Sequence, residues 1–307
     1  MPLIECVPNV SEGRRADVIA ALGAALAAPG VHMLDRSSDP SHNRTVYTFA
    51  GEPSALRDAV LRLFAAAVDA IDLRAHDGVH PRIGAVDVVP FVPLQGSTME
   101  ECVTLAKSTA ALVAERFHVP VFLYEEAATT DERRSLSNIR RGGVNGVALR
   151  MKQAAWRPDF GPDQPHPTAG ATAIGARPIL IAYNVNLASN RLGVAKRIAS
   201  VVRASDGGLA NVKALGLQLD HGIVQVSMNL TSYKDTSMMT VFDAIAREAA
   251  VDGVRVLESE IVGLVPADAL PSDPARRLKL RAEDLDKVLE RRLEEQTKNE
   301  ERKTNST

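Results

Sequence analysis

The stretch HDGVHPRIGAVDVVPFVP, residues 76–93, predicts a loop that leads directly into a buried strand. A glycine weakens any helix at the start of this stretch and Pro81 ends one, whereas residues 86–92 are rich in the β-branched side chains that favour a strand. His76 and His80 therefore lie on a loop anchored by a rigid element, where binding and catalytic groups are often placed. Because the pKa of histidine lies near neutral pH, either side chain can exchange a proton there. Of the two, we expect His76 to be exposed at the surface and His80 to be positioned by its neighbours.

Composition and charge predict a globular protein of one large domain or two ordinary ones. The chain has 307 residues, 45% hydrophobic and 24% charged, and its net charge of −2 gives no indication of a nucleic-acid partner. The N-terminus lacks a basic region followed by a long apolar stretch, and no apolar run could span a bilayer, so we expect a cytoplasmic protein with no membrane partner. Cys6 and Cys102 lie in apolar surroundings, which predicts free thiols in a reducing compartment.

The first part of the chain predicts the order β-α-β-β-α-β, which is typical of ferredoxin-like folds. Ser11 is expected to cap the first helix, and Pro53 to open the second. The apolar stripe of the second helix is Leu56, Val60, Leu63, Phe64 and Ala67. Strands are expected at residues 3–7, 31–34, 45–49 and 86–92. An added unit follows, with a helix capped by Ser97 and Glu100, a strand at residues 119–124 and short helices around residues 134–141.

The second part predicts the same order again, with strands at residues 178–185, 212–219, 223–230 and 254–265 and helices at residues 191–202 and 240–250. We therefore expect an α/β fold of two βαββαβ modules, residues 1–176 and 177–270, that pack together with a ligand cleft between them. A charged tail, residues 271–307, is expected to be helical over residues 282–302 and partly disordered. WRPDFGPDQPHPTAG, residues 156–170, crosses between the modules; its composition suits a linker equally well, but its tryptophan, aspartate and histidine are unusual for one.

Polar residues follow or precede several expected strands and are candidates for substrate binding. Asn9 and Glu12 follow the first strand, and His42, Asn43 and Arg44 precede the third. Helix capping and an ordinary turn explain these residues equally well. As ligand contacts, the arginine would suit a carboxylate, which it can bind through two parallel hydrogen bonds.

The spacing His76-Asp77-x-x-His80 resembles a zinc-binding motif that requires a helix. Gly78 and Pro81 break that helix and no third ligand is evident, so we predict no metal site. The chain also lacks a glycine-rich phosphate loop and a serine nucleophile elbow.

With these stretches identified, the chain resembles the formiminotransferase (glutamate formimidoyltransferase) family, which includes the first domain of the bifunctional formiminotransferase-cyclodeaminases. The runs that carry the resemblance, in chain order, are ECVPNVSEG (5–13), HNRTVYTF (42–49), HPRIGAVDVVPFVP (80–93), WRPDFGP (156–162), GATAIGAR (170–177) and IVGLVP (261–266). They spread over about nine-tenths of the chain.

The resemblance implies two α/β subdomains with a folate tunnel between them, usually in a homodimer. It implies transfer of the formimino group from N-formimino-L-glutamate to tetrahydrofolate, in histidine degradation. The catalytic histidine of the family falls on His80. Its folate-binding segment falls on Gly161, Pro162, Asp163, Gln164, Pro165, His166, Pro167, Thr168, Ala169 and Gly170.

The chemistry suits these assignments and needs no metal. Folate N5 attacks the amidine-like formimino carbon, N5 loses a proton and the glutamate nitrogen gains one, so one neutral imidazole can act first as base and then as acid. Asp87 or Glu12 could stabilise the cationic amidinium, and Arg82 and Arg44 are candidates for the substrate carboxylates.

The chain also departs from the bifunctional pattern. No cyclodeaminase domain follows, so we expect a separate cyclodeaminase to take the product. The loop ASDGGLAN (204–211) has no lysine or arginine, where bifunctional members are basic, which puts capture of a polyglutamate tail there in doubt. Three alternatives stay open: a folate-binding protein without activity, a glutamate formyltransferase linked to 5-formyltetrahydrofolate, and a ferredoxin-like interaction module.

Overall fold

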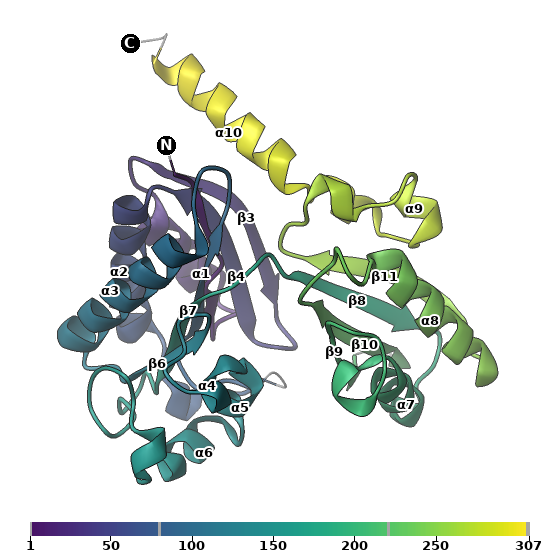
Figure 1. Cartoon of the computed structure of the whole chain (residues 1–307), viewed down its shortest axis with the longest axis horizontal. Helices are drawn as coiled ribbons and strands as arrows, with labels where there is room; N and C mark the ends of the chain where they lie inside the picture. Colours follow the sequence, from purple (N-terminus) through teal and green to yellow (C-terminus); the bar gives the residue numbers. More distant parts are fainter. Residues whose placement is uncertain (1, 79–80, 220–221, 305–307) are drawn as a thin grey trace. The chain divides into compact units, whose positions relative to one another are not determined.

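The computed structural model describes residues 2–78, 81–219 and 222–304, which form two compact units, Met1–Arg177 and Pro178–Thr307 (Figure 1). The described strands form one sheet in each unit, and helices pack on both sheets. The predicted α/β class is therefore confirmed.

The first sheet begins with the predicted ferredoxin-like arrangement. Its first strand is split into β1 (Ile4–Cys6) and β2 (Asn9–Val10), and both halves lie between β4 (Arg44–Gly51) and β5 (Val86–Pro93). β3 (Val31–Asp39) pairs with the outer side of β4. All these pairs are antiparallel, and α1 (Ala16–Leu26) and α2 (Pro53–Ala70) complete the β-α-β-β-α-β order.

The sheet then continues beyond β5 in parallel pairing. α3 (Met99–Phe117) leads to β6 (Val121–Glu125), and β7 (Thr172–Ala176) inserts between β5 and β6. β7 was not among the predicted strands, because its segment TAIGA contains one β-branched aliphatic residue and no aromatic one. Small residues are needed there, because a Cβ on Gly175 would lie 2.2 Å from the carbonyl oxygen of Tyr124.

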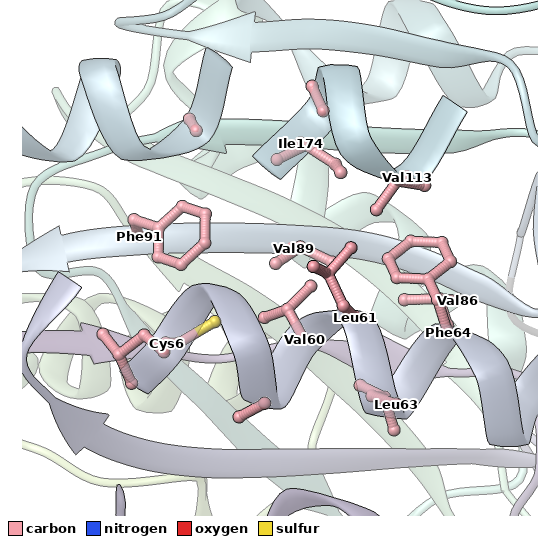
Figure 2. Close-up of a cluster of buried hydrophobic side chains, with 14 of the residues drawn as sticks. Cys6, Val60, Leu61, Leu63, Phe64, Val86, Val89, Phe91, Val113 and Ile174 are labelled. Carbon is pink, nitrogen blue, oxygen red and sulfur yellow. The ribbon is translucent and has the colours of Figure 1, made fainter. Parts of the chain in front are cut away.

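Helices α1, α2 and α3 bury one face of this sheet. All five residues of the predicted α2 stripe are buried. Figure 2 shows Val60 and Phe64 of α2 beside Val86 and Val89 of β5, within one apolar cluster. Burial of one such side chain contributes roughly 1.5–3 kcal/mol, so this face fixes the register of the strands that carry the site.

Three short helices follow β6: α4 (Asp131–Arg134), α5 (Leu136–Arg140) and α6 (Gly143–Arg150). The last two contribute to a smaller apolar cluster on the opposite face of the sheet. Ile139 and Val147 pack there with Val88, Phe122 and Ala173, which alternate along their strands with residues of the main core. The expected short helices are thus present, and α5 places Arg140 beside the start of β5.

The second unit is a ferredoxin-like sheet with strand order β11-β8-β10-β9, all antiparallel. Its strands are β8 (Ile181–Leu187), β9 (Val212–Gln218), β10 (Val224–Leu230) and β11 (Val256–Val262). α7 (Leu192–Val202) and α8 (Met238–Val251) pack on one face with a second apolar core. The predicted repeat is confirmed. The Asp220-His221 part of the expected hairpin lies outside the described residues.

Two predicted helix caps are wrong. α1 begins at Ala16, and the Ser11 hydroxyl instead donates to the carbonyl oxygen of Gly84 at 2.7 Å. The capping box of α3 is formed by Thr98 and Glu101, one residue beyond the predicted pair. Ser97 misses the box because its hydroxyl donates to the carbonyl of Leu3 at 2.7 Å.

The segment after residue 270 is more ordered than a charged tail. α9 (Pro274–Arg277) and a 3-10 turn (Ala282–Asp284) precede α10 (Leu289–Thr304), so the predicted helix starts seven residues late. Leu278 and Leu280 join the second core, and the buried Asp284 accepts a hydrogen bond from the backbone N–H of Ile261 at 3.2 Å. No helix in the described part of the chain is long and apolar enough to cross a membrane.

Candidate functional site

Three separate segments meet around the side chain of Asn43, in the turn between β3 and β4. Its Oδ1 accepts a hydrogen bond from the backbone N–H of Gly13 at 2.9 Å, and its Nδ2 donates to the carbonyl oxygen of Asp77 at 2.8 Å. Asn43 itself has a φ of 48°, which asparagine tolerates better than most residues. One side chain thus ties the segment after β2 and the loop before β5 to this turn.

Glu12 is a buried carboxylate held at the start of α1. Its Oε1 accepts the backbone N–H groups of Arg14 and Arg15 at 2.8 and 2.9 Å, and its Oε2 pairs with the Arg15 guanidinium. Burial acts to raise its pKa, but these hydrogen bonds outweigh burial and hold the pKa of Glu12 below its usual value. The residue is therefore an anion at neutral pH, and its donors come from Arg14 and Arg15, which directly precede α1. Asn9 donates to the carbonyl of Val7 at 3.2 Å.

Arginines gather around one buried carboxylate, Asp87, at the start of β5. Its Oδ1 accepts the backbone N–H of Ile83 at 2.6 Å, and its Oδ2 pairs with the guanidinium of Arg140 from α5. Burial, and then the charge of Arg140, lower the pKa of Arg44 to about 10. The charge of Arg82 acts on Arg44 in the same direction. Such crowding of like charges favours an anionic ligand. Arg140 was not among the predicted site residues, because no nearby sequence motif indicates that α5 packs beside β5.

His76 is not the surface residue that the sequence suggested. It is half-buried, its Nε2 lies 3.2 Å from the carbonyl oxygen of Asn43, and its Nδ1 contacts Arg82. Burial and the Arg82 charge lower the pKa of His76. Arg82 also donates to the carbonyl oxygens of Gly78 at 2.8 Å and His42 at 3.3 Å. His76 and Arg82 therefore brace the loop together, a role that the expectation of exposure excluded.

His80 lies outside the described residues, but the flanks of its loop are fixed. In the turn between β3 and β4, Nδ1 of the buried His42 lies 3.6 Å from the carboxylate of Asp39. A Cβ added to Gly78 would lie 2.6 Å from the carbonyl oxygen of His42, so the loop approaches the turn closely at that point. Gly78, before His80, and Arg82, after it, therefore both lie against this turn. We call His42, Asn43, His76 and Arg82 the polar cluster.

The end of segment 161–170 is hydrogen-bonded to residues that flank the same loop. The backbone N–H groups of Leu73 and Ala85 donate to the carbonyls of Thr168 and Ala169, both at 2.9 Å. Gly170 has a φ of +70°, and a Cβ there would lie 2.2 Å from the carbonyl of Ile83. Leu73, before His80, and Ala85, after it, are therefore both hydrogen-bonded to the end of this segment. We call the longer stretch, residues 157–170, the strap.

A buried ion pair secures the beginning of the strap. Arg133 and Asp159 are joined at 2.9 Å, and their side chains are only 6% and 8% exposed. Asp159 also accepts the backbone N–H of Leu123 at 2.8 Å, while Arg133 donates to the carbonyls of Ala155 and Arg157 and lies over the rings of Phe122 and Trp156. Between the two anchors, Gly161, Asp163, Gln164 and Pro167 are exposed. The strap is thus held at both ends and open between them.

No group of three histidine, cysteine or acidic side chains among residues 2–78, 81–219 and 222–304 is placed to hold a metal ion. A hollow of about 530 Å³ between the N-terminal ends of α2 and α3 is lined by Arg57, Glu100, Glu101 and neighbouring residues, none of which belongs to the polar cluster.

Two family models match almost the whole chain. The formiminotransferase domain, N-terminal subdomain, matches residues 3–177, and the formiminotransferase domain matches residues 182–285. The chain belongs to the formiminotransferase family. The resemblance drawn from the sequence motifs is therefore confirmed.

Curated relatives of this formiminotransferase-family chain fall into two groups. Glutamate formimidoyltransferases from Thermoplasma acidophilum and Streptococcus pyogenes serotype M1 are 46% and 44% identical, over 96% and 87% of this chain and 98% and 90% of their own. Formimidoyltransferase-cyclodeaminase of Sus scrofa is 46% identical over 87% of this chain, which spans about half of that protein (51%). The likeness therefore extends nearly end to end only for the shorter relatives.

Proposed function

We propose that this chain is a glutamate formimidoyltransferase, which transfers the formimino group of N-formimino-L-glutamate to tetrahydrofolate in histidine degradation. The products are 5-formiminotetrahydrofolate and L-glutamate. The observation that carries the proposal is the 46% identity, over nearly the full length of both chains, to a protein of that name. The polar cluster and the strap, which both contact the segment from Leu73 to Ala85, supply groups of chemistry that suits the two substrates and support the proposal.

In this proposal His80 is the general acid–base group. It takes the proton from folate N5 as N5 attacks the formimino carbon, and it returns that proton to the glutamate nitrogen as the C–N bond of the tetrahedral intermediate breaks. No metal is required, because the amidine carbon is already electrophilic. Alignment of the two bound substrates supplies much of the rate.

The remaining residues bind and orient the substrates. The arginine-rich surroundings of Asp87, with Arg44 and Arg82, suit the two carboxylates of formiminoglutamate. Glu12 and Asp87 are the anions available to offset the amidinium charge, with Asn9, His42 and Asn43 shaping the turn beside them. The part of the strap from Gly161 to Gly170 forms a wall of the tetrahydrofolate site. We further propose a cytoplasmic homodimer.

Steady-state turnover with formiminoglutamate and tetrahydrofolate tests the function directly. We expect His80→Ala to lower kcat by roughly two to four orders of magnitude, the usual contribution of a general acid–base group, and added imidazole to restore part of it. His76→Ala should act mainly on the KM for formiminoglutamate, because His76 braces Arg82. Near-normal turnover in His80→Ala would assign the proton transfer to another residue.

Two controls separate the competing activities. Turnover with a 5-formyltetrahydrofolate–glutamate pair in place of the formimino donor would favour a formyltransferase, and tight folate binding without any turnover would favour a binding protein. Activity should survive dialysis against a chelator; loss of activity that zinc restores would contradict a metal-free mechanism.

A further inference from the structure

A β-bulge near the start of β5 presents the carboxylate of Asp87 to the segment that precedes this strand. Two adjacent residues of β2 pair with Val86 and Val88, so Asp87 is the extra residue between them. Such bulges redirect a side chain and are frequent beside functional sites. Here Oδ1 of Asp87 accepts the backbone N–H of Ile83 at 2.6 Å. The backbone just after His80 is thus hydrogen-bonded to a side chain of a rigid strand.

Arg140, at the end of α5, holds the second oxygen of Asp87. Its Nη2 donates to Oδ2 of Asp87, and the side chains of Arg140 and Asp87 are only 14% and 4% exposed. A buried carboxylate needs a cation beside it, and a charged acceptor binds a backbone N–H more strongly than a neutral one. Arg140 therefore supports the contact between Asp87 and Ile83 as well as its own contact with Asp87.

The helix that carries Arg140 is itself fixed against the same segment. Ile139 of α5 and Ile83 are both fully buried in the smaller apolar cluster. Arg150 of α6 donates to the carbonyl oxygen of Ile139 at 2.6 Å, and its guanidinium lies 4.7 Å from the centre of the Trp156 ring. Arg140 therefore stands on an element whose place is set by packing and hydrogen bonds before any substrate binds.

We propose that Arg140 is a positioning residue of the transferase, which acts through Asp87 to fix the backbone at Ile83 and thereby the end of the loop that carries His80. The inference rests on the proposed function. Arg140 touches no reacting atom and exchanges no proton; its guanidinium contacts Asp87 rather than a substrate. Since a displacement of about 1 Å at a reacting group can cost about a hundredfold in rate, such a residue controls turnover without controlling affinity.

Two substitutions at Arg140 and one beside it separate positioning from substrate binding. Arg140→Gln removes the cation and should lower kcat by about tenfold to a hundredfold, while the KM for each substrate stays within about twofold. Arg140→Lys should restore most of the turnover, because one ammonium nitrogen can take the place of Nη2 beside Asp87. Arg141→Gln, at the exposed next residue, is the control and should keep the kcat of the unaltered protein.

Hydrogen exchange of the Ile83 amide, followed by NMR on the full chain, tests the same contact without activity. The amide should exchange about tenfold faster in Arg140→Gln than in the unaltered protein, as expected for the loss of one net hydrogen bond, and Arg140→Lys should keep it protected.

Unchanged exchange at Ile83, or a normal kcat, in folded Arg140→Gln would overturn the inference while leaving the transferase intact. A KM for formiminoglutamate that rises about tenfold in both variants would also overturn it, because Arg140 would then bind the substrate. If Arg140→Gln does not fold, Arg140→Lys decides, since the inference requires that variant to fold with near-normal kcat. If the unaltered protein has no turnover, the proposed function fails first and the positioning role fails with it.

Discussion

Replacing Glu5 with glutamine should remove a pH-dependent cost in folding stability. Glu5 lies in β1, where its neighbours Ile4 and Cys6 enter the main core and Glu5 itself is 6% exposed. Burial, offset in part by the charge of Arg177, raises the pKa of Glu5 from 4.5 to about 7. Because the folded-state pKa is the higher one, stability is fully retained below pH 4.5 and is lost as the pH rises to about 7. This change in proton affinity corresponds to about 3 kcal/mol.

Urea denaturation of the unaltered protein and of Glu5→Gln, at pH 5 and pH 8, measures this cost. The difference in free energy of unfolding between the two proteins should move by about 2.5 kcal/mol in favour of Glu5→Gln between these pH values. Glu115→Gln, an exposed site on α3, is the control and should show no such trend. A constant difference between Glu5→Gln and the unaltered protein at both pH values would refute the assigned pKa.

Three further substitutions test the anchors of the structure. Asp159→Ala strands its buried arginine partner, so it should cost roughly 3–5 kcal/mol in urea denaturation and weaken tetrahydrofolate binding. Gly170→Ala should lower the melting temperature well beyond Gly207→Ala, which shares its positive φ but has no atom within 4 Å of the added Cβ. Leu278→Ala should cost about 2–5 kcal/mol if the C-terminal segment belongs to the second core, whereas Leu149→Ala, 65% exposed, should cost little.

The sequence predicted most elements of both sheets because their signals are local. The α2 stripe and the β-branched runs of β5 and β10 each state their own periodicity. β7 escaped because its fitness for the sheet is not local: Gly175 is required by the approach of Tyr124, a residue 51 positions earlier. The caps at Ser11 and Ser97 failed for a related reason, since both hydroxyls bond to distant carbonyls, of Gly84 and Leu3.

The same distinction between local and distant signals separates the site residues that the sequence predicted from those that it did not. Motifs pointed to Arg44, Arg82 and Asp87 because they lie in distinctive runs, whereas Arg140 and Arg133 lie in an unremarkable basic stretch. Their importance comes from their partners, Asp87 at a separation of 53 residues and Asp159 at 26. A sequence window as long as one helix or strand contains neither pair.

A proline- and glycine-rich segment such as residues 161–170 has little structure of its own, so its conformation must be imposed by contacts at its ends. The Arg133–Asp159 pair imposes it at one end, and the hydrogen bonds to Leu73 and Ala85 impose it at the other. Since Leu73 and Ala85 flank the loop of His80, a displacement of the strap at that end must also disturb the loop. Damage there should therefore affect both tetrahydrofolate affinity and turnover.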